Sequence, residues 1–417
     1  MKSQRSQILF YFLFSILFIV TAIYFISRDP FQWFKTKGND FVVQWLAVRT
    51  FAKENLSPYM PVVQTTTEEF VYGNSVPADE KGLKFSSPLY SALFILPFAL
   101  VSNVKSAQFI WMILSGIILM ANAGIAFRLT GWKPPIGLLF FTLSFTGLGF
   151  YNLQTMASGS VIILSSLFVF SSLVAIRLRR HELAGILLAM ATIQPRAVVL
   201  VIVFILVWSI SKRLWSILVW FLAGEVMLII LGLFFIPDWP LQYLRIVFQF
   251  KDFYQVITPV AVFSSELPGM GRQLGWGLSL IMVIILFFEW LAARKKDFNW
   301  FLWTVSLTLV VSPWIGIPSD PNDFVLLILP LILILAAWDQ RFSRFGKWMA
   351  GIGLLILLAV LWGIFVMNYH ELSSLQLSRI FLFPMPFFLL IGLYWVRWWA
   401  IKPQVDFIEE ISSLDRY

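Results

Sequence analysis

The chain has 417 residues, of which 59% are hydrophobic and 13% are charged, and its formal net charge is +9. Soluble domains are about 25% charged, and runs of roughly 18 or more apolar residues recur here without the alternation of membrane β-strands. We therefore expect an all-α polytopic membrane protein. The chain has no cysteine and two histidines, which excludes Cys/His metal sites, thiol nucleophiles and disulfides.

The positive charge does not indicate a nucleic-acid partner. Proteins with many spans collect Lys and Arg on their cytoplasmic loops, and no soluble basic domain is present to bind nucleic acid. Membrane lipids are the expected surroundings. Any catalysis must rest on carboxylates, hydroxyls, amides and basic side chains.

The first apolar run extends from Ile8 to Ile26, after the basic segment MKSQRSQ. It is too long for the core of a signal peptide and lacks a small-residue cleavage site, so we interpret it as an uncleaved span. Lys2 and Arg5 then predict a cytoplasmic N-terminus.

Residues 27–85 follow as a long first extracytoplasmic loop, in which seven basic and seven acidic residues balance. Apolar side chains repeat with helical spacing from residue 41 to 55, which predicts an interfacial helix. The apolar side of this helix holds Phe41, Trp45, Val48 and Ala52. Asp40 lies at its first turn, where the helix dipole favours a carboxylate. A plain N-cap is the competing role for this residue.

The apolar segment 85–101 contains Pro88 and Pro97. As a full span it would put the basic clusters at residues 128–133 and 177–180 outside. As a helix that dips in from the outer face, it puts both clusters inside. The positive-inside rule favours the dipping helix.

Further spans are predicted at 106–127, 135–151, 159–176, 214–236, 274–292, 300–315, 323–338, 347–367 and 380–398. Between them, a hairpin of short helices at 182–194 and 196–210 is broken at Gln194-Pro195, because proline cannot continue a helix. The total is about twelve membrane helices in a single domain of residues 1–400. Outer segments are expected at 152–158, 194–196, 316–323 and around His370, with a second large outer loop at 237–273. Residues 401–417 form a cytoplasmic tail.

Several motifs occur in a fixed order along residues 8–340. They are Asp40-Phe41-Val42-Val43, Ser57-Pro58-Tyr59, Ser87-Pro88-Leu89, Gly159, Ala184-Gly185 with Gln194-Pro195, Trp239-Pro240 with Tyr243, and Ser312-Pro313-Trp314. In this order the chain resembles the polyprenol-phosphate-mannose-dependent mannosyltransferases, which are C-type (GT-C) glycosyltransferases. It departs from them at Ser160, where the family usually has Gln, and at Gln194, where it often has Lys. After the Ser-Pro pair, where the family has a stretch that contains His, this chain has residues 315–323.

The resemblance implies a GT-C-type bundle and an inverting transfer of a hexose, with mannose as the default. The sugar would leave a polyprenyl phosphate and join a hydroxyl of a lipid or glycan acceptor. Asp40 would take the acceptor proton as general base. One carboxylate is enough for this reaction, because the polyprenyl phosphate leaves as a stable anion and needs little protonation by a general acid. No cofactor is predicted.

Cations at the outer interface are the candidates for binding the donor phosphate. They are Lys84, Arg196, Arg245 and Arg272. Ordinary contacts with lipid headgroups are the alternative for each. The candidates for binding the sugar or the acceptor are Asn39, Tyr59, Asn152, Gln154, Gln194 and Trp239. The amides at 152, 154 and 194 could equally satisfy backbone groups freed at helix breaks. Trp45 and Tyr243 are further stacking candidates.

Three acidic residues leave alternatives open. Glu225 lies inside an apolar span, where a carboxyl needs a partner, and it could bond to a neighbouring helix or serve catalysis. Asp320 and Asp323 flank Pro321-Asn322, which forms a turn or, as the less favoured alternative, binds a divalent cation.

Two other functions compete with glycosyl transfer. A transporter or flippase of lipid-linked saccharides predicts a polar pathway that reaches both faces, whereas the polar segments here concentrate outside. The other alternative is a divergent family member without catalytic activity.

Overall fold

The computed structural model describes residues 16, 40–73, 83–253, 257–368 and 379–401. These residues form helices and connecting segments, and no β-strand occurs among them. The N-terminal helices are α3 (Asp40–Glu54), α4 (Pro61–Tyr72), η1 (Leu89–Ser91), α5 (Ala92–Ala99), α6 (Val104–Thr130), α7 (Ile136–Leu148), α8 (Phe150–Ser158) and α9 (Ile162–Arg177). The central ones are α10 (His181–Ala191), α11 (Pro195–Ser211), α12 (Trp215–Phe235), α13 (Trp239–Phe253) and α14 (Pro259–Glu266). The C-terminal ones are α15 (Gly271–Ala293), α16 (Phe298–Val311), η2 (Ser312–Ile315), η3 (Pro321–Leu327), α17 (Ile328–Asn368), α19 (Pro384–Trp395) and α20 (Trp398–Ile401).

Six helical stretches are long and apolar enough to cross a membrane, which confirms the polytopic helical class. They are 104–130, 215–235, 271–293, 298–315, 321–342 and 345–368. A seventh results if α7 and α8, bent by 43°, count as one span. The other described apolar helices are shorter, at 10–17 residues. The predicted count of about twelve spans therefore stays a prediction, and the first span at 8–26 and the tail from residue 402 lie outside the described residues.

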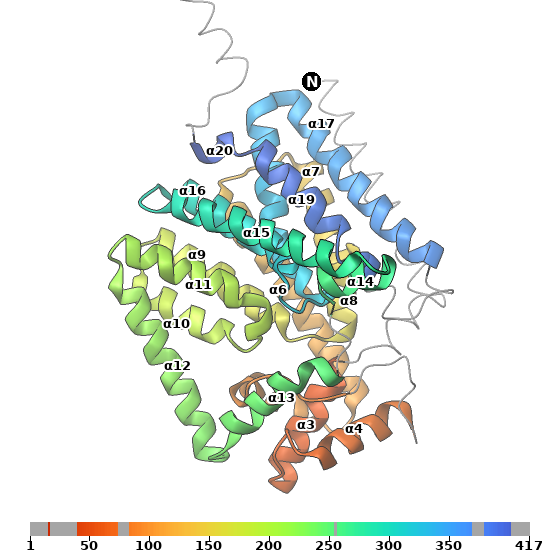
Figure 1. The fold of residues 1–417 in the computed structure, drawn as a ribbon. Coiled ribbons are helices and arrows are strands. Elements are labelled where there is room, and N and C mark those ends of the chain that lie inside the picture. The colour runs from red at the N-terminus through yellow and green to blue at the C-terminus, as the bar shows by residue number, and fades with distance from the viewer. Residues whose placement is uncertain (1–15, 17–39, 74–82, 254–256, 369–378, 402–417) are drawn as a thin grey trace, which may run out of the picture.

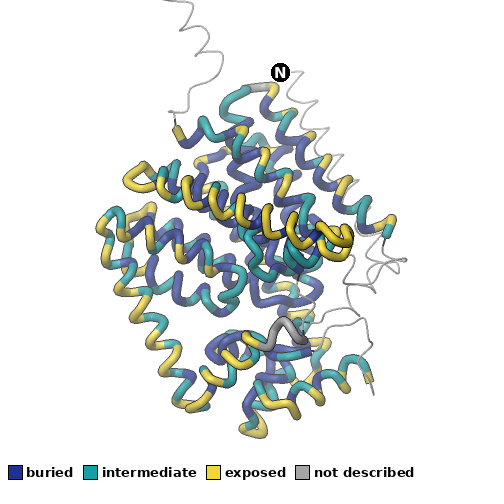
Figure 2. The backbone as a smooth tube through the Cα atoms, in the orientation of Figure 1, coloured by how far each residue is buried: buried dark blue, intermediate teal, exposed yellow. Residues whose placement is uncertain are grey.

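The helices are arranged around a buried centre. In Figure 1, α17, α19 and α20 lie at one end, α3, α4 and α13 lie at the other, and α12 runs along one edge between the α10–α11 hairpin and α13. The most apolar 18-residue part of 321–342 is fully buried, whereas only 11% of the corresponding part of α12 and 22% of that of α15 are buried (Figure 2). These two helices therefore present apolar side chains outward, as lipid-facing helices do.

The predicted short helices are present. The stretch Leu89–Ala99 rises about 16 Å, too little for a hydrocarbon core of about 30 Å, in agreement with a helix that does not cross. The hairpin also forms, because α10 ends at Ala191 and α11 begins at Pro195. Gly185 lets α10 lie directly against α12, since a Cβ there would be 2.5 Å from the Ile217 carbonyl oxygen.

One predicted loop is wrong. Residues 152–158 belong to helix α8, which packs against η3. The buried Asn152 donates from Nδ2 to the carbonyl oxygen of Thr146 at 2.9 Å, across the break between α7 and α8. This side chain therefore satisfies a backbone group freed at a helix break, which was the structural alternative for Asn152.

The start of helix α3 makes a tight contact with the bundle. Its first apolar residue, Phe41, is fully buried and lies beside Trp111, with ring centroids 5.8 Å apart. Gly159, which ends α8 with φ of +70°, sits directly beneath Phe41, and any Cβ there would overlap the Phe41 Cβ. The glycine thus sets how closely the start of α3 approaches the bundle.

This contact predicts that Gly159→Ala destabilises the protein beyond the effect of backbone strain. Gly131, at the end of α6, has a similar φ of +67° but no atom within 4 Å of its Cβ position. Gly131→Ala should therefore cost only about 1–2 kcal/mol for the left-handed conformation. Gly159→Ala should add about 1–3 kcal/mol for overpacking. The two variants are compared by thermal unfolding in detergent, and equal melting temperatures would contradict the contact.

Candidate functional site

Asp40 occupies the first position of α3 and faces a segment far along the chain. The Asn322 amide donates from Nδ2 to Oδ2 of Asp40 at 3.1 Å, across 282 residues of sequence. Asn322 is buried and belongs to η3. Its backbone carbonyl accepts a hydrogen bond from the Thr155 hydroxyl at 3.2 Å, which anchors η3 on α8. The predicted Asp40 carboxylate is therefore held by a side chain from the C-terminal half.

The turn before η3 is closed by its two aspartates. Asp320 caps the helix and accepts from the Asn322 backbone N–H at 2.9 Å, while Asp323 accepts from the Asp320 N–H at 2.9 Å. This reciprocal arrangement is a capping box. The residues predicted as a turn are therefore the capped first turn of helix η3. Among the described residues there is no group of three or more His, Cys, Asp or Glu placed to hold a metal ion.

Asp323 also forms an ion pair with Arg196, at the first turn of α11. The Arg196 Nη2 lies 3.3 Å from Oδ2 of Asp323, and the two side chains are 28% and 10% exposed. The pair joins the start of α11 to the start of η3. Because Asn322 precedes Asp323, the same pair fixes the amide that contacts Asp40.

A second set of polar contacts runs from α3 to the α10–α11 break. Gln44 lies one helical turn after Asp40, so both side chains share a face of α3. The Gln44 Nε2 donates to Ser87 Oγ at 3.0 Å, and Ser87 Oγ donates to Gln194 Oε1 at 3.3 Å. Gln194 is two residues before Arg196, so the contacts form a closed circuit. We call this set the polar cluster: Asp40, Gln44, Ser87, Gln194, Arg196, Asn322 and Asp323.

Two buried amide oxygens of the polar cluster accept no hydrogen bond from the described residues. Gln44 is 7% exposed and Asn322 is 6% exposed. Neither Gln44 Oε1 nor Asn322 Oδ1 accepts a hydrogen bond from any part of the chain that the structure describes. A buried acceptor without a donor is costly. Both oxygens are therefore suited to a ligand that brings hydroxyl groups.

Aromatic side chains lie beside the polar cluster. The Tyr59 hydroxyl donates to the Ser87 carbonyl oxygen at 2.9 Å, and burial raises the pKa of Tyr59 well above its ordinary value. Tyr243 on α13 lies 6.3 Å from the Tyr59 ring, and its pKa is raised to about 12 by burial, against the opposing effect of Arg196. Tyr243 therefore stays neutral at physiological pH and can donate through its hydroxyl.

The other predicted residues are not members of the polar cluster as defined above. Lys84 is half-buried, three residues before Ser87, and burial lowers its pKa against the effect of Glu68. Arg245 on α13 and Arg272 on α15 are exposed and make no contact with the cluster that the structure records. Gln154 on α8 is half-buried. Asn39 lies outside the described residues.

Two predicted aromatic residues have packing roles. Trp239, at the start of α13, is buried against Gly232 of α12, where a Cβ would lie 2.5 Å from the indole Nε1. Trp45 is buried and donates from Nε1 to the Phe98 carbonyl oxygen at 3.0 Å. Both indoles join helices to one another, and Trp239 also borders Tyr90, with ring centroids 5.9 Å apart.

Sequence analysis missed Gln44 and the role of Asn322. A local signal existed for Gln44, because it follows Asp40 by four residues on the same predicted helix. Asn322 stands in a stretch interpreted as a turn or, as the less favoured alternative, a cation site, and no local pattern connects it with Asp40.

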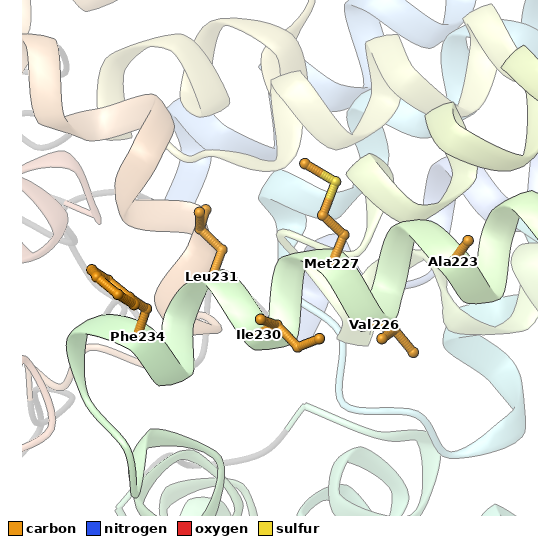
Figure 3. Close-up of a pocket in the computed structure, with 6 residues that line it drawn as sticks. All are labelled: Ala223, Val226, Met227, Ile230, Leu231 and Phe234. Atoms are coloured by element: carbon orange, nitrogen blue, oxygen red, sulfur yellow. The ribbon is translucent and has the colours of Figure 1, made fainter.

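An apolar groove of about 520 Å³ lies along α12. Its lining residues are Ala223, Val226, Met227, Ile230, Leu231 and Phe234. Figure 3 shows these side chains following one another along the helix. Beyond Leu231, the neighbouring Gly232 contacts Trp239, so this end of α12 approaches the aromatic residues beside the polar cluster.

The ion pair predicts a coupling between Arg196 and Asp323. Arg196→Met leaves a buried carboxylate without its cation and should cost about 2–3 kcal/mol of unfolding free energy, somewhat less than a fully buried pair. In Arg196→Met/Asp323→Asn that carboxylate is gone, so part of the loss should be regained. Unfolding in detergent measures both variants. Arg397→Met breaks a similar pair with Glu289, at 2.8 Å, and serves as a control away from the cluster. Additive effects of the two substitutions would contradict the coupling.

Comparisons with protein-family models, with curated proteins and with solved structures find no match for this chain.

Proposed function

We propose that this protein is an integral membrane glycosyltransferase that transfers a hexose, by default mannose, from a polyprenyl-phosphate sugar to a hydroxyl of a lipid or glycan acceptor. The observation that carries the proposal is the polar cluster. Within it, the carboxylate of Asp40, the guanidinium of Arg196 and the amide oxygens of Gln44 and Asn322 belong to one connected set of contacts. These groups are what an acceptor hydroxyl, a phosphate and a sugar require.

Helix polarity supports a phosphate near this cluster. Arg196 lies in the first turn of α11, whose start has no side-chain cap. Helix N-termini carry partial positive charge and backbone N–H donors, which favour anions. The start of α11 together with Arg196 would stabilise the polyprenyl phosphate as it leaves, whereas the starts of α3 and η3 already carry carboxylates.

The lipid part of the donor has a surface of matching chemistry. The groove on α12 is lined by apolar side chains alone, and little of α12 is buried within the protein. A prenyl chain along this groove would keep its methyl groups out of water. Its phosphate end would then point toward Trp239 and the polar cluster.

In this mechanism Asp40 accepts the proton of the acceptor hydroxyl as that oxygen attacks the anomeric carbon. The bond to the phosphate oxygen breaks, and the polyprenyl phosphate departs with the electron pair. Inversion follows because attack and departure occur on opposite faces of the sugar. The Asn322 amide donates to Asp40 and would orient the carboxylate for this proton transfer.

Asp40→Asn should abolish the base with little change in shape. Membranes that contain the protein are supplied with radiolabelled polyprenyl-phospho-mannose, and transfer to lipid and glycan fractions is counted. Loss of a general base should lower turnover by about 10²–10⁴-fold. Asp297→Asn is the matched control, because Asp297 caps α16 away from the cluster and asparagine caps equally well. Wild-type turnover in Asp40→Asn would refute the assignment.

A further inference from the structure

Helix α12 has two chemically different faces. Successive residues of an α-helix are rotated by about 100°, so Glu225 points away from the groove residues Val226 and Ile230. Gly232, seven residues after Glu225, shares its face and contacts Trp239. The carboxyl of Glu225 is therefore directed toward the bundle, on the side where Tyr90 and Trp239 lie.

Glu225 lies beside the break between α10 and α11, because α12 packs against α10 and η1. Its carboxyl lies close to Thr192 and Tyr90, and the Thr192 hydroxyl donates to the Ala189 carbonyl oxygen at 2.6 Å. The Thr192 hydroxyl lies 2.8 Å from the Tyr90 hydroxyl, and Tyr90 also donates to the Thr192 carbonyl oxygen at 3.2 Å. One carboxyl oxygen of Glu225, Oε1, is buried and makes no hydrogen bond with any residue that the structure describes.

A carboxyl inside an apolar helix is costly unless something compensates it. Glu289, in the candidate span α15, is compensated by Arg397, at 2.8 Å, and by the Tyr394 hydroxyl, at 3.4 Å. No ion pair of Glu225 is recorded within the part of the chain that the structure describes, and the neighbouring Thr192 hydroxyl is used by the Ala189 carbonyl oxygen. Oε1 of Glu225 is therefore left as an acceptor for a donor from outside the chain.

The surroundings of Glu225 adjoin the polar cluster. Thr192 is two residues before Gln194, and Tyr90 is three residues after Ser87. The Tyr90 ring lies 5.9 Å from Trp239, which in turn lies 6.2 Å from Tyr243 beside the cluster. A group bound at Glu225 would therefore lie next to a phosphate bound at Arg196, which is where the sugar of a sugar phosphate must be.

We propose that Oε1 of Glu225 accepts a hydrogen bond from one hydroxyl of the donor sugar and so selects the hexose, with Thr192 and Tyr90 lying beside the carboxylate. This inference rests on the proposed function, because it concerns the sugar of the polyprenyl-phosphate donor. A bond from a hydroxyl to a carboxylate discriminates strongly against an analogue that lacks the hydroxyl, since the acceptor is then left buried and unpaired.

The test measures binding, so that it does not depend on turnover. The purified protein in nanodiscs binds radiolabelled decaprenyl-phospho-mannose, and each monodeoxy analogue of that donor competes for it. The wild type should bind one analogue about 10- to 100-fold more weakly than the parent. In Glu225→Gln the discrimination at that position should fall to a few-fold, and in Glu225→Leu it should disappear.

The control is Glu289→Gln, the same change in another carboxyl of a candidate span. It should keep the wild-type discrimination even if its thermal stability falls. Unchanged discrimination in Glu225→Gln overturns the inference, and so does a wild type that binds every analogue as tightly as the parent. Transfer activity is measured separately on the same samples. Discrimination that depends on Glu225 without any transfer would refute the proposed function and retain the sugar subsite, whereas no binding of the donor would overturn both.

Discussion

The ion pair between Arg196 and Asp323 is the constraint on which the candidate site depends. Asp323 closes the capping box of η3 and at the same time pairs with the first turn of α11. The neighbouring Asn322 is thereby held where its amide donates to Asp40. One partly buried charge pair thus ties together three helix starts from distant parts of the chain. The low exposure of Asp323 makes the pair sensitive to loss of either partner, because a buried charge without its partner is strongly unfavourable.

Much of the fold follows from local rules. Proline breaks the helix at Gln194-Pro195, as predicted. The stretch Leu89–Ala99 is too short to cross a bilayer, in agreement with the dipping helix that the positive-inside rule predicts. Residues 152–158 were wrongly predicted as a polar segment between two spans, because their side chains interrupt the apolar pattern. In the structure Asn152 bonds to the end of α7 and α8 packs on η3, so tertiary contacts override the local pattern.

The site was predictable only in part. Asp40, Gln194 and Arg196 stand at predicted helix ends, where polar groups are expected, and the structure brings them into one cluster. The partner of Arg196 lies 127 residues away, and no spacing rule connects the two. Arg245 and Arg272 illustrate the converse limit. Their charge made them candidates for binding the phosphate, yet both side chains are exposed. Charge alone does not indicate whether a side chain faces a cavity or the membrane surface.

Helix α12 belongs both to the apolar outer surface of the bundle and to the polar interior. Its outward face carries the apolar groove, while its inward face carries Glu225 and the glycine that receives Trp239. A residue that served only to brace α12 would be cheaper as threonine or serine, since a hydroxyl can bond to a neighbouring helix without the desolvation cost of a carboxyl. The cost of Glu225 is explained if its unbonded Oε1 accepts a hydrogen bond from a ligand, as proposed. Under the proposed function, α12 would hold the prenyl chain on its outward face and contact the sugar on its inward face.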